Sequence, residues 1–389
     1  MNRNLWLLTL CQGLFLTNNV TFIAINGLVG LNLAPLGWMA TLPVMAYVVG
    51  GALSTGLVAQ TQRRFGRKAS FELGLVVAVL SALLCCYAAY SRNFWLLVTA
   101  TLVAGYYNAN AQLYRFAAAE LALPGFREKA ISLVMAGGLL GAVAGPNLAS
   151  STRSLSAVPF AGAYLALAGV ALLAMALLAF IHFPPPPPQH ASSGGRPLGE
   201  IMRQPVFIVA AAAGALGYGV MNLLMAATPI AMQVCGLPFS SVAWVLEWHV
   251  IGMFAPGFFT GHLIKRYGTL TVMATGLALN VACVLVALSG VEFRQFLVAL
   301  FLLGLGWNFL FTGATTLALT AYRPEEKDKA QGALNFCVFA VLAVSSLASG
   351  VLVTTQGWAL LNLGSLLPLS LTALALGWLG LQQRRLRKA

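Results

Sequence analysis

Two pairs of side chains able to bind a soft metal ion lie on consecutive apolar segments between residues 205 and 264. Met221 and Met225 lie on the first segment, and His249 and Met253 on the second. Each pair is spaced by four residues, so its members share one face of a helix. If the helices fold back antiparallel at equal pitch, Met225 lies level with His249, and Met221 with Met253. Three thioethers and one imidazole then converge, which is a ligand set suited to copper, Cu(I) above all.

Each of these residues also has an ordinary structural explanation. Methionine is flexible and usually fills gaps between apolar helices. A histidine within a membrane span is costly to bury and tends to face a cavity or a partner. A hydrogen bond from His249 to Glu247 or to a backbone carbonyl would satisfy it without any metal.

Three further residues near this pair are candidates for ion entry or proton transfer. Met232 lies seven residues beyond Met225 on the same face, and Cys235 follows in the turn. In one interpretation the two pass a soft ion inward. In the other, Met232 packs at the membrane interface and Cys235 is a free thiol. Glu247 is the one carboxylate well inside an expected span, so it either carries a proton or is simply hydrated.

Arg115 lies deep in the fourth apolar segment, with Asn108 and Gln112 on roughly the same face. In one interpretation it holds an anionic substrate. In the other it pairs with Glu72 or Glu120 as part of an inner gate, because both acids lie at the same ends of their helices. Further polar residues within spans one, seven and ten line a transport cavity or form interhelical hydrogen bonds; they are Asn18, Asn19, Asn26, Asn222, Trp307 and Asn308.

The composition is that of an all-α membrane protein. Of 389 residues, 59% are hydrophobic and 8% charged, against about 25% charged in soluble domains. Apolar runs of membrane-spanning length recur throughout. The net charge of +13 lies in short loops, which argues against nucleic-acid binding. The six cysteines form no CxxC motif, so neither a disulfide framework nor a zinc site is expected. No nucleophile, base and orienting acid fall in one aqueous region, so an enzyme is not expected.

Twelve transmembrane helices are expected, in two pseudo-symmetric six-helix bundles. Their positions are 5–31, 36–60, 70–90, 94–118, 129–152, 158–182, 205–232, 240–264, 270–289, 294–320, 329–354 and 357–380. Five consecutive prolines and a Ser/Gly patch separate the halves. The expected units are an N-terminal bundle (1–183), a cytoplasmic proline-rich linker (184–204), and a C-terminal bundle with a basic tail (205–389). The first segment is too long for a signal-peptide core, so we expect it to be retained.

Basic residues set the expected orientation. Eighteen Lys and Arg residues lie on the side of the termini and the linker, and three on the other. Both termini are therefore expected in the cytoplasm. Arg67 and its basic neighbours in the loop after span two are assigned to topology and to a gate. The halves also repeat: Gly66-Arg67-Lys68 after span two has a counterpart in residues 261–268 after span eight, which indicates parallel repeats.

The repeat, the linker and the Gly-x-x-x-x-Arg-x-Gly loop resemble the major facilitator superfamily over essentially the whole chain. Residues 141–146, Gly-Ala-Val-Ala-Gly-Pro, resemble its GxxxGP motif, which is common in proton-coupled exporters. Three positions depart from the pattern. Arg63 and Lys265 replace the acid usual in the two loops, and Thr101 stands where span four usually carries arginine. These departures weaken the resemblance to an ordinary drug/proton antiporter.

Within that superfamily, the pattern Met221, Met225, His249 and Met253 is similar to the CcoA-type copper importers. The resemblance implies a multi-pass protein of the bacterial inner membrane that imports copper by alternating access and supplies cytochrome oxidase assembly. Copper is then the cargo and not a cofactor, and the expected partners are copper and membrane lipids, with no nucleic acid and a monomeric state. The alternative is a proton-coupled carrier of an organic solute, either a drug or metabolite exporter or a vitamin importer.

Overall fold

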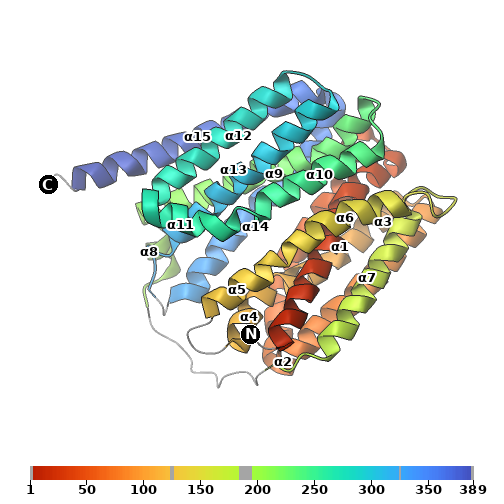
Figure 1. Ribbon diagram of the computed structural model, residues 1–389, viewed down its shortest axis with the longest axis horizontal. Coiled ribbons are helices and arrows are strands. Elements are labelled where there is room, and N and C mark those ends of the chain that lie inside the picture. The colour runs from red at the N-terminus through yellow and green to blue at the C-terminus, as the bar shows by residue number, and fades with distance from the viewer. Residues whose placement is uncertain (1–2, 123–126, 184–194, 324–325, 387–389) are drawn as a thin grey trace.

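The computed structural model describes residues 3–122, 127–183, 195–323 and 326–386, and the ordered elements in these ranges are all helical (Figure 1). The N-terminal half contains α1 (Arg3–Leu33), the short helix η1 (Gly37–Met39), α2 (Leu42–Tyr90), α3 (Phe94–Ala111), α4 (Tyr114–Leu121), α5 (Arg127–Ala136), α6 (Gly138–Thr152) and α7 (Ala161–Ala179). The C-terminal half contains α8 (Leu198–Met202), α9 (Pro205–Val234), α10 (Phe239–Phe254), α11 (Gly257–Tyr267), α12 (Thr269–Leu288), α13 (Phe293–Ala318), α14 (Lys327–Thr355) and α15 (Gly357–Leu386).

Within the described residues, 10 helical segments are long and apolar enough to cross a membrane, and the bent pair α10–α11 makes an eleventh. The long helix α2 supplies two of these segments, which meet near Gly66. The remaining expected span, 94–118, corresponds to α3 and α4. Two tyrosines and two asparagines near the end of α3 make it less apolar than the others.

Three of the expected spans are broken where the hydropathy pattern predicts one continuous helix. The first break separates α3 from α4, the second lies at Gly137, and the third at Pro256. A Cβ at Gly137 would overlap the carbonyl of Thr9, so glycine is required for α1 to approach this closely. Pro256 lacks an N–H group and interrupts the helical ladder, and the axes of α10 and α11 differ by 43°.

The two halves repeat the same packing. The first helix of each half, α1 or α9, packs against its two last helices, which are α6 and α7 in one half and α14 and α15 in the other. The connection after the second span repeats as well, because Gly66 (φ 81°, ψ 171°) and Gly268 (φ 86°, ψ 153°) share one backbone conformation. A positive φ suits glycine. The proline run of the expected linker lies outside the described residues, and α8 occupies part of the linker after it.

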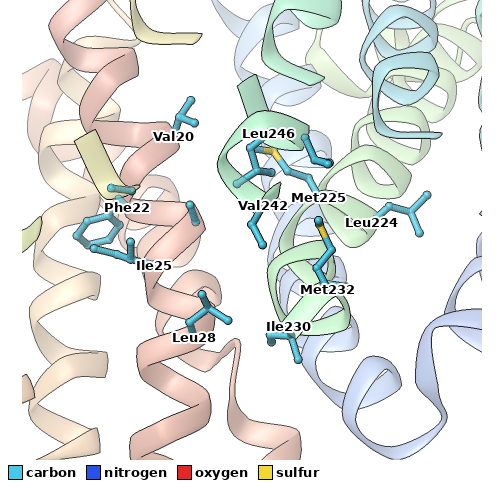
Figure 2. Packing of buried hydrophobic residues seen from close by; sticks show 14 of the residues in the cluster. Val20, Phe22, Ile25, Leu28, Leu224, Met225, Ile230, Met232, Val242 and Leu246 are labelled. Atoms are coloured by element: carbon cyan, nitrogen blue, oxygen red, sulfur yellow. The ribbon is translucent and has the colours of Figure 1, made fainter. Parts of the chain in front are cut away.

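The halves lie side by side (Figure 1) and meet along four helix pairs of the described chain, α1–α9, α2–α14, η1–α14 and α6–α10. One apolar cluster of buried residues extends across this boundary. Figure 2 shows part of it, with Leu28 of α1 pointing toward the region of α9 that carries Ile230, and Ile25 lying beside Phe22. We call the end of the bundle that carries the α9–α10 turn the Gly236 end, and the opposite end the linker end.

Candidate substrate site between the two halves

The three methionines of the predicted copper site are buried in the apolar cluster that joins the halves. Met221 is 3% exposed, Met225 5% and Met253 6%. Met225 lies in this cluster together with Val242 and Leu246 of α10 (Figure 2). The structure therefore places these thioethers in packed apolar surroundings, which is also the ordinary environment of methionine.

His249 is completely buried, and its ring is turned toward α13. Its Nδ1 atom lies 2.7 Å from the backbone carbonyl of Leu300. Because a carbonyl only accepts, Nδ1 is the donor. This is the backbone bond that the sequence leaves open as the ordinary explanation of the histidine. Within the described part of the chain the Nε2 atom has no hydrogen-bond partner.

The residues proposed for ion entry lie in different environments. Met232 is completely buried, whereas Cys235 is exposed in the turn between α9 and α10. Over the ranges that the structure describes, no group of three or more His, Cys, Asp or Glu side chains is placed to hold a metal ion. The predicted set of three methionines and one histidine is a site of a different kind.

Four aromatic residues of the C-terminal half form a cluster that sequence reasoning identified only in part. Trp307 and Phe311 lie one turn apart on α13, with stacked rings 5.1 Å between centroids. Tyr218 of α9 makes edge contacts with both, at 5.1 and 5.2 Å, and Phe254 of α10 contacts Trp307 at 6.2 Å. We call these four residues the aromatic cluster. The spacing of Trp307 and Phe311 was a signal available in the sequence.

A polar pair of the N-terminal half joins α1 to α2. Asn19 of α1 donates a hydrogen bond to the Tyr47 hydroxyl of α2 at 3.0 Å. Asn19 and Tyr218 are each partly exposed on helices that are otherwise deeply buried.

Arg115 is the second residue of α4 in the N-terminal half. Its guanidinium carbon lies 5.0 Å from the centroid of the Phe116 ring. Its Nε atom is buried and has no hydrogen-bond partner among the described residues. The two amides expected on its face contact each other, since Gln112 donates to Asn108 at 3.4 Å.

The interpretation in which Arg115 pairs with Glu120 is wrong. Glu120 is taken by Arg67, whose Nε atom lies 2.6 Å from the Glu120 Oε2 atom. Arg67 also donates to the Gln62 side chain at 2.8 Å. This network lies entirely within the N-terminal half, and it leaves the Arg115 guanidinium without that counterion.

Glu247 contacts the other half of the protein. Its Oε2 atom accepts a hydrogen bond of 2.8 Å from Asn147 of α6.

Two further sets of contacts join the halves at the Gly236 end. Arg153 stacks on the ring of Phe160 and, across the boundary, on that of Phe239, at 5.4 and 5.5 Å.

At the same end, Thr41 bridges to α14. Its hydroxyl donates to the carbonyl of Ser346 at 2.6 Å and accepts from the N–H of Gly350 at 2.9 Å. A Cβ at Gly350 would overlap Thr41, so the backbone approach requires glycine. These contacts hold the halves together at the Gly236 end.

Comparisons with known proteins agree with this architecture. A family model described as the Major Facilitator Superfamily matches residues 5–255 and 211–388. The riboflavin transporter RfnT of Brucella anthropi is 39% identical over 363 residues, which cover 92% of this chain and 91% of that protein. The uncharacterized MFS-type transporter YddS of Bacillus subtilis is 27% identical over 352 residues, 86% of this chain and 81% of the relative.

Among solved structures, the human organic anion transporter MFSD10 has a TM-score of 0.68 at 16% identity. The alignment covers 95% of this chain and 99% of that one. At this identity the likeness shows a shared fold.

Proposed function

Because the chain belongs to the major facilitator superfamily, we propose that it carries an organic solute across the membrane, and that the solute is riboflavin or a closely related flavin. This is the alternative that the sequence left beside copper. The observation that carries the proposal is the 39% identity with a riboflavin transporter, which extends over nine-tenths of both chains.

The aromatic cluster supplies a physical reason. A flavin presents a flat, fused three-ring system, and such rings stack well on tryptophan, tyrosine and phenylalanine. Stacking of a heteroaromatic base on an aromatic side chain contributes about 1–3 kcal/mol. Trp307, Phe311 and Tyr218 lie together between α9 and α13. A flavin that inserts beside them as the halves move would gain such contacts.

The proposed transport cycle is alternating access, with the two halves rocking about the site. The distribution of basic residues supports an orientation in which the Gly236 end lies outside the cell. The contacts of Asn147, Arg153 and Thr41 then close the outer end of the boundary. Import would break these contacts to admit the cargo and remake them before its release to the cytoplasm.

The test is uptake of radiolabelled riboflavin in a bacterial strain that requires riboflavin and lacks its own transporter. Cells expressing the full chain should accumulate label and grow on low riboflavin, and cells with an empty vector should not. Protein that reaches the membrane without raising uptake would contradict the proposal.

A second candidate cargo, copper, keeps one supporting observation. The Nε2 atom of His249 is buried without a partner in the described structure, and the three methionines lie in the boundary cluster. Radioactive copper uptake, with Met221→Ala, Met225→Ala, His249→Ala and Met253→Ala compared with the wild type, decides the matter. Loss in every variant supports copper import, and unchanged uptake in all four removes it.

A further inference from the structure

Two mainly apolar grooves lie at equivalent positions in the two halves, each beside the turn that follows the second span. The first, of about 430 Å³, lies between the two arms of α2 and α3. The second, of about 310 Å³, lies between α11, α12 and α13. We propose that each groove binds one anionic phospholipid from the leaflet at the linker end, with an acyl chain in the groove and the phosphate on Arg64 or Arg266. The proposal goes beyond the transport function and does not depend on the identity of the cargo.

The internal repeat builds the mouths of the two grooves from the same parts. Residues 63–66 and 265–268 both read basic residue, arginine, aromatic residue, glycine. Gly66 and Gly268 share one backbone conformation with positive φ. The chain therefore turns in the same way after each arginine and aromatic residue, and a ligand that suits one groove suits the other.

An arginine is held over an aromatic side chain in the wall of each groove. The guanidinium carbon of Arg64 lies 5.2 Å from the centroid of the Phe65 ring, and both residues line the first groove. The guanidinium carbon of Arg266 lies 5.3 Å from the centroid of the Tyr267 ring, which lines the second. An arginine over an aromatic face gains a cation–π contact that restrains its guanidinium. Each positive charge is thus kept at the groove.

These two arginines are available to a ligand from outside the protein. Arg67, one residue beyond Gly66, is bound to Glu120. By contrast, Arg64 and Arg266 are exposed and form no ion pair within the parts of the chain that the structure describes. A guanidinium is a planar fork that matches two oxygens of one phosphate. A phosphate monoanion or diester at each groove mouth would therefore find a free binding group.

The walls of the grooves suit an acyl chain. Leu57 and Leu73 line the first groove and are 58% and 43% exposed, on helical segments of membrane-spanning length. Leu57 lies nine residues before Gly66, which is about 13 Å along a helix and most of one leaflet of a hydrocarbon core about 30 Å thick. Each groove is lined by residues of one half alone, so it is separate from the boundary between the halves.

The charges at the grooves favour an anionic lipid over a zwitterionic one. The described lining of neither groove includes an acidic side chain, and exposed Lys265 precedes Arg266. A choline headgroup would bring its own cation beside these positive charges. A phosphatidylglycerol headgroup carries the phosphate and no cation. Basic side chains at a membrane surface gain binding energy from anionic lipids for this reason.

The experiment counts lipids bound to the purified full-length protein in detergent by native mass spectrometry during lipid titration. Dioleoylphosphatidylglycerol is the probe, dioleoylphosphatidylcholine has the same chains on a zwitterionic headgroup, and sn-glycerol 3-phosphate has the phosphate without chains. The variants are Arg64→Gln, Arg266→Gln and the double variant. Arg203→Gln is the matched control, because Arg203 is exposed at the linker end, forms no ion pair in the described structure and lines neither groove.

We expect two phosphatidylglycerol molecules on the wild type at concentrations that leave phosphatidylcholine unbound. Each single arginine variant should weaken one of the two sites by about fivefold, the effect of one basic residue near anionic lipid. The double variant should weaken both, and Arg203→Gln should stay within about twofold of the wild type. Equal retention of the two phospholipids, or an unchanged titration of the double variant, overturns the proposal. So does an equal effect of Arg203→Gln.

A second pair of variants tests the acyl chain without changing any charge. Leu57→Gln places a polar group in the first groove and should weaken one site. Leu53→Gln should not, because Leu53 is one turn earlier on the same face of α2, is 70% exposed and does not line the groove. Binding of sn-glycerol 3-phosphate as tight as that of phosphatidylglycerol would show that the chain contributes nothing and would contradict a lipid site.

The unfolding temperature of each variant without added lipid separates a lost lipid site from misfolding. The result is also independent of the cargo, because no riboflavin is present. Protein that binds two anionic lipids and moves no riboflavin contradicts the proposed function alone. Protein that imports riboflavin and binds both phospholipids equally contradicts this proposal alone.

Discussion

The amide of Asn147 on α6 donates a 2.8 Å hydrogen bond to the carboxylate of Glu247 on α10, and so joins the N-terminal half to the C-terminal half. This bond gives Glu247 a role that does not depend on proton transfer. It belongs to the same set of contacts at the Gly236 end as Arg153 and Thr41.

Glu247→Gln should therefore keep most of the uptake activity, because a glutamine carbonyl still accepts from Asn147. Glu247→Ala removes the acceptor and should lower uptake and the unfolding temperature, with a net loss of about 0.5–1.5 kcal/mol for one hydrogen bond. Uptake assays over a range of external pH provide the check. If Glu247→Gln instead abolishes pH-dependent uptake, Glu247 carries a proton.

Trp307→Ala should raise the riboflavin concentration needed for half-maximal uptake by about tenfold or more, since stacking on one aromatic side chain contributes about 1–3 kcal/mol. Trp307→Phe keeps an aromatic face and should lose less. Trp244→Ala is the control, because Trp244 lies on α10 and is 55% exposed. An equal effect of Trp307→Ala and Trp244→Ala would rule out a specific stacking role.

His249→Ala should destabilise the protein more than it affects flavin binding. The change removes the donor to the Leu300 carbonyl and leaves a buried polar group unsatisfied, at a cost of about 1–3 kcal/mol. Met221→Leu, which conserves volume, should cost less than about 1.5 kcal/mol. Thermal unfolding of the purified proteins measures both. Unchanged stability of His249→Ala together with loss of copper uptake would favour the copper site.

The contact between the linker and the C-terminal half should depend on pH. Glu326 is buried and accepts hydrogen bonds from the Arg196 side chain, the Arg323 N–H and the Arg196 N–H. These donors, the Arg196 guanidinium first, hold the pKa of the Glu326 carboxyl well below its ordinary value. The ionised Glu326 carboxylate therefore stabilises the folded protein fully above the ordinary glutamate pKa of about 4.3. This stabilisation is lost as the pH falls toward the lower pKa that Glu326 has in the folded protein.

Comparison with Glu326→Gln tests this effect. The difference in unfolding temperature between wild type and variant should be constant from pH 7 to pH 5 and should shrink at lower pH. A difference that does not change with pH would show that the charge of Glu326 contributes nothing to the contact.

Much of the fold was predictable because a lipid environment leaves few choices. Backbone N–H and C=O groups in a membrane must form their hydrogen bonds within the same segment, so long apolar runs become helices. The repeat of Gly66 and Gly268 was visible in the sequence and recurs in the backbone. The break at Gly137 was not predicted, because it depends on the approach of α1 at Thr9, a contact between distant parts of the chain.

The candidate site was predicted less well, for a similar reason. Pairing α9 and α10 as an isolated hairpin assumed that each helix faces only the other. In the structure α10 also packs on α13, and His249 is turned to Leu300 there. The residues of the aromatic cluster come from three helices. No sequence spacing links Tyr218 of α9 or Phe254 of α10 to the pair on α13. Arg115 was recognised as a candidate, but the sequence could not show that Arg67, and not Arg115, reaches Glu120.

The aromatic cluster belongs wholly to the C-terminal half of the protein. A flavin stacked on it would stay with that half as the halves rock, so the contacts that the N-terminal half makes with the cargo would break and form again in each cycle. Strengthening the stacking by mutation would then slow release of the cargo even as it tightens binding, and the fastest carrier is one that binds its cargo with only moderate affinity.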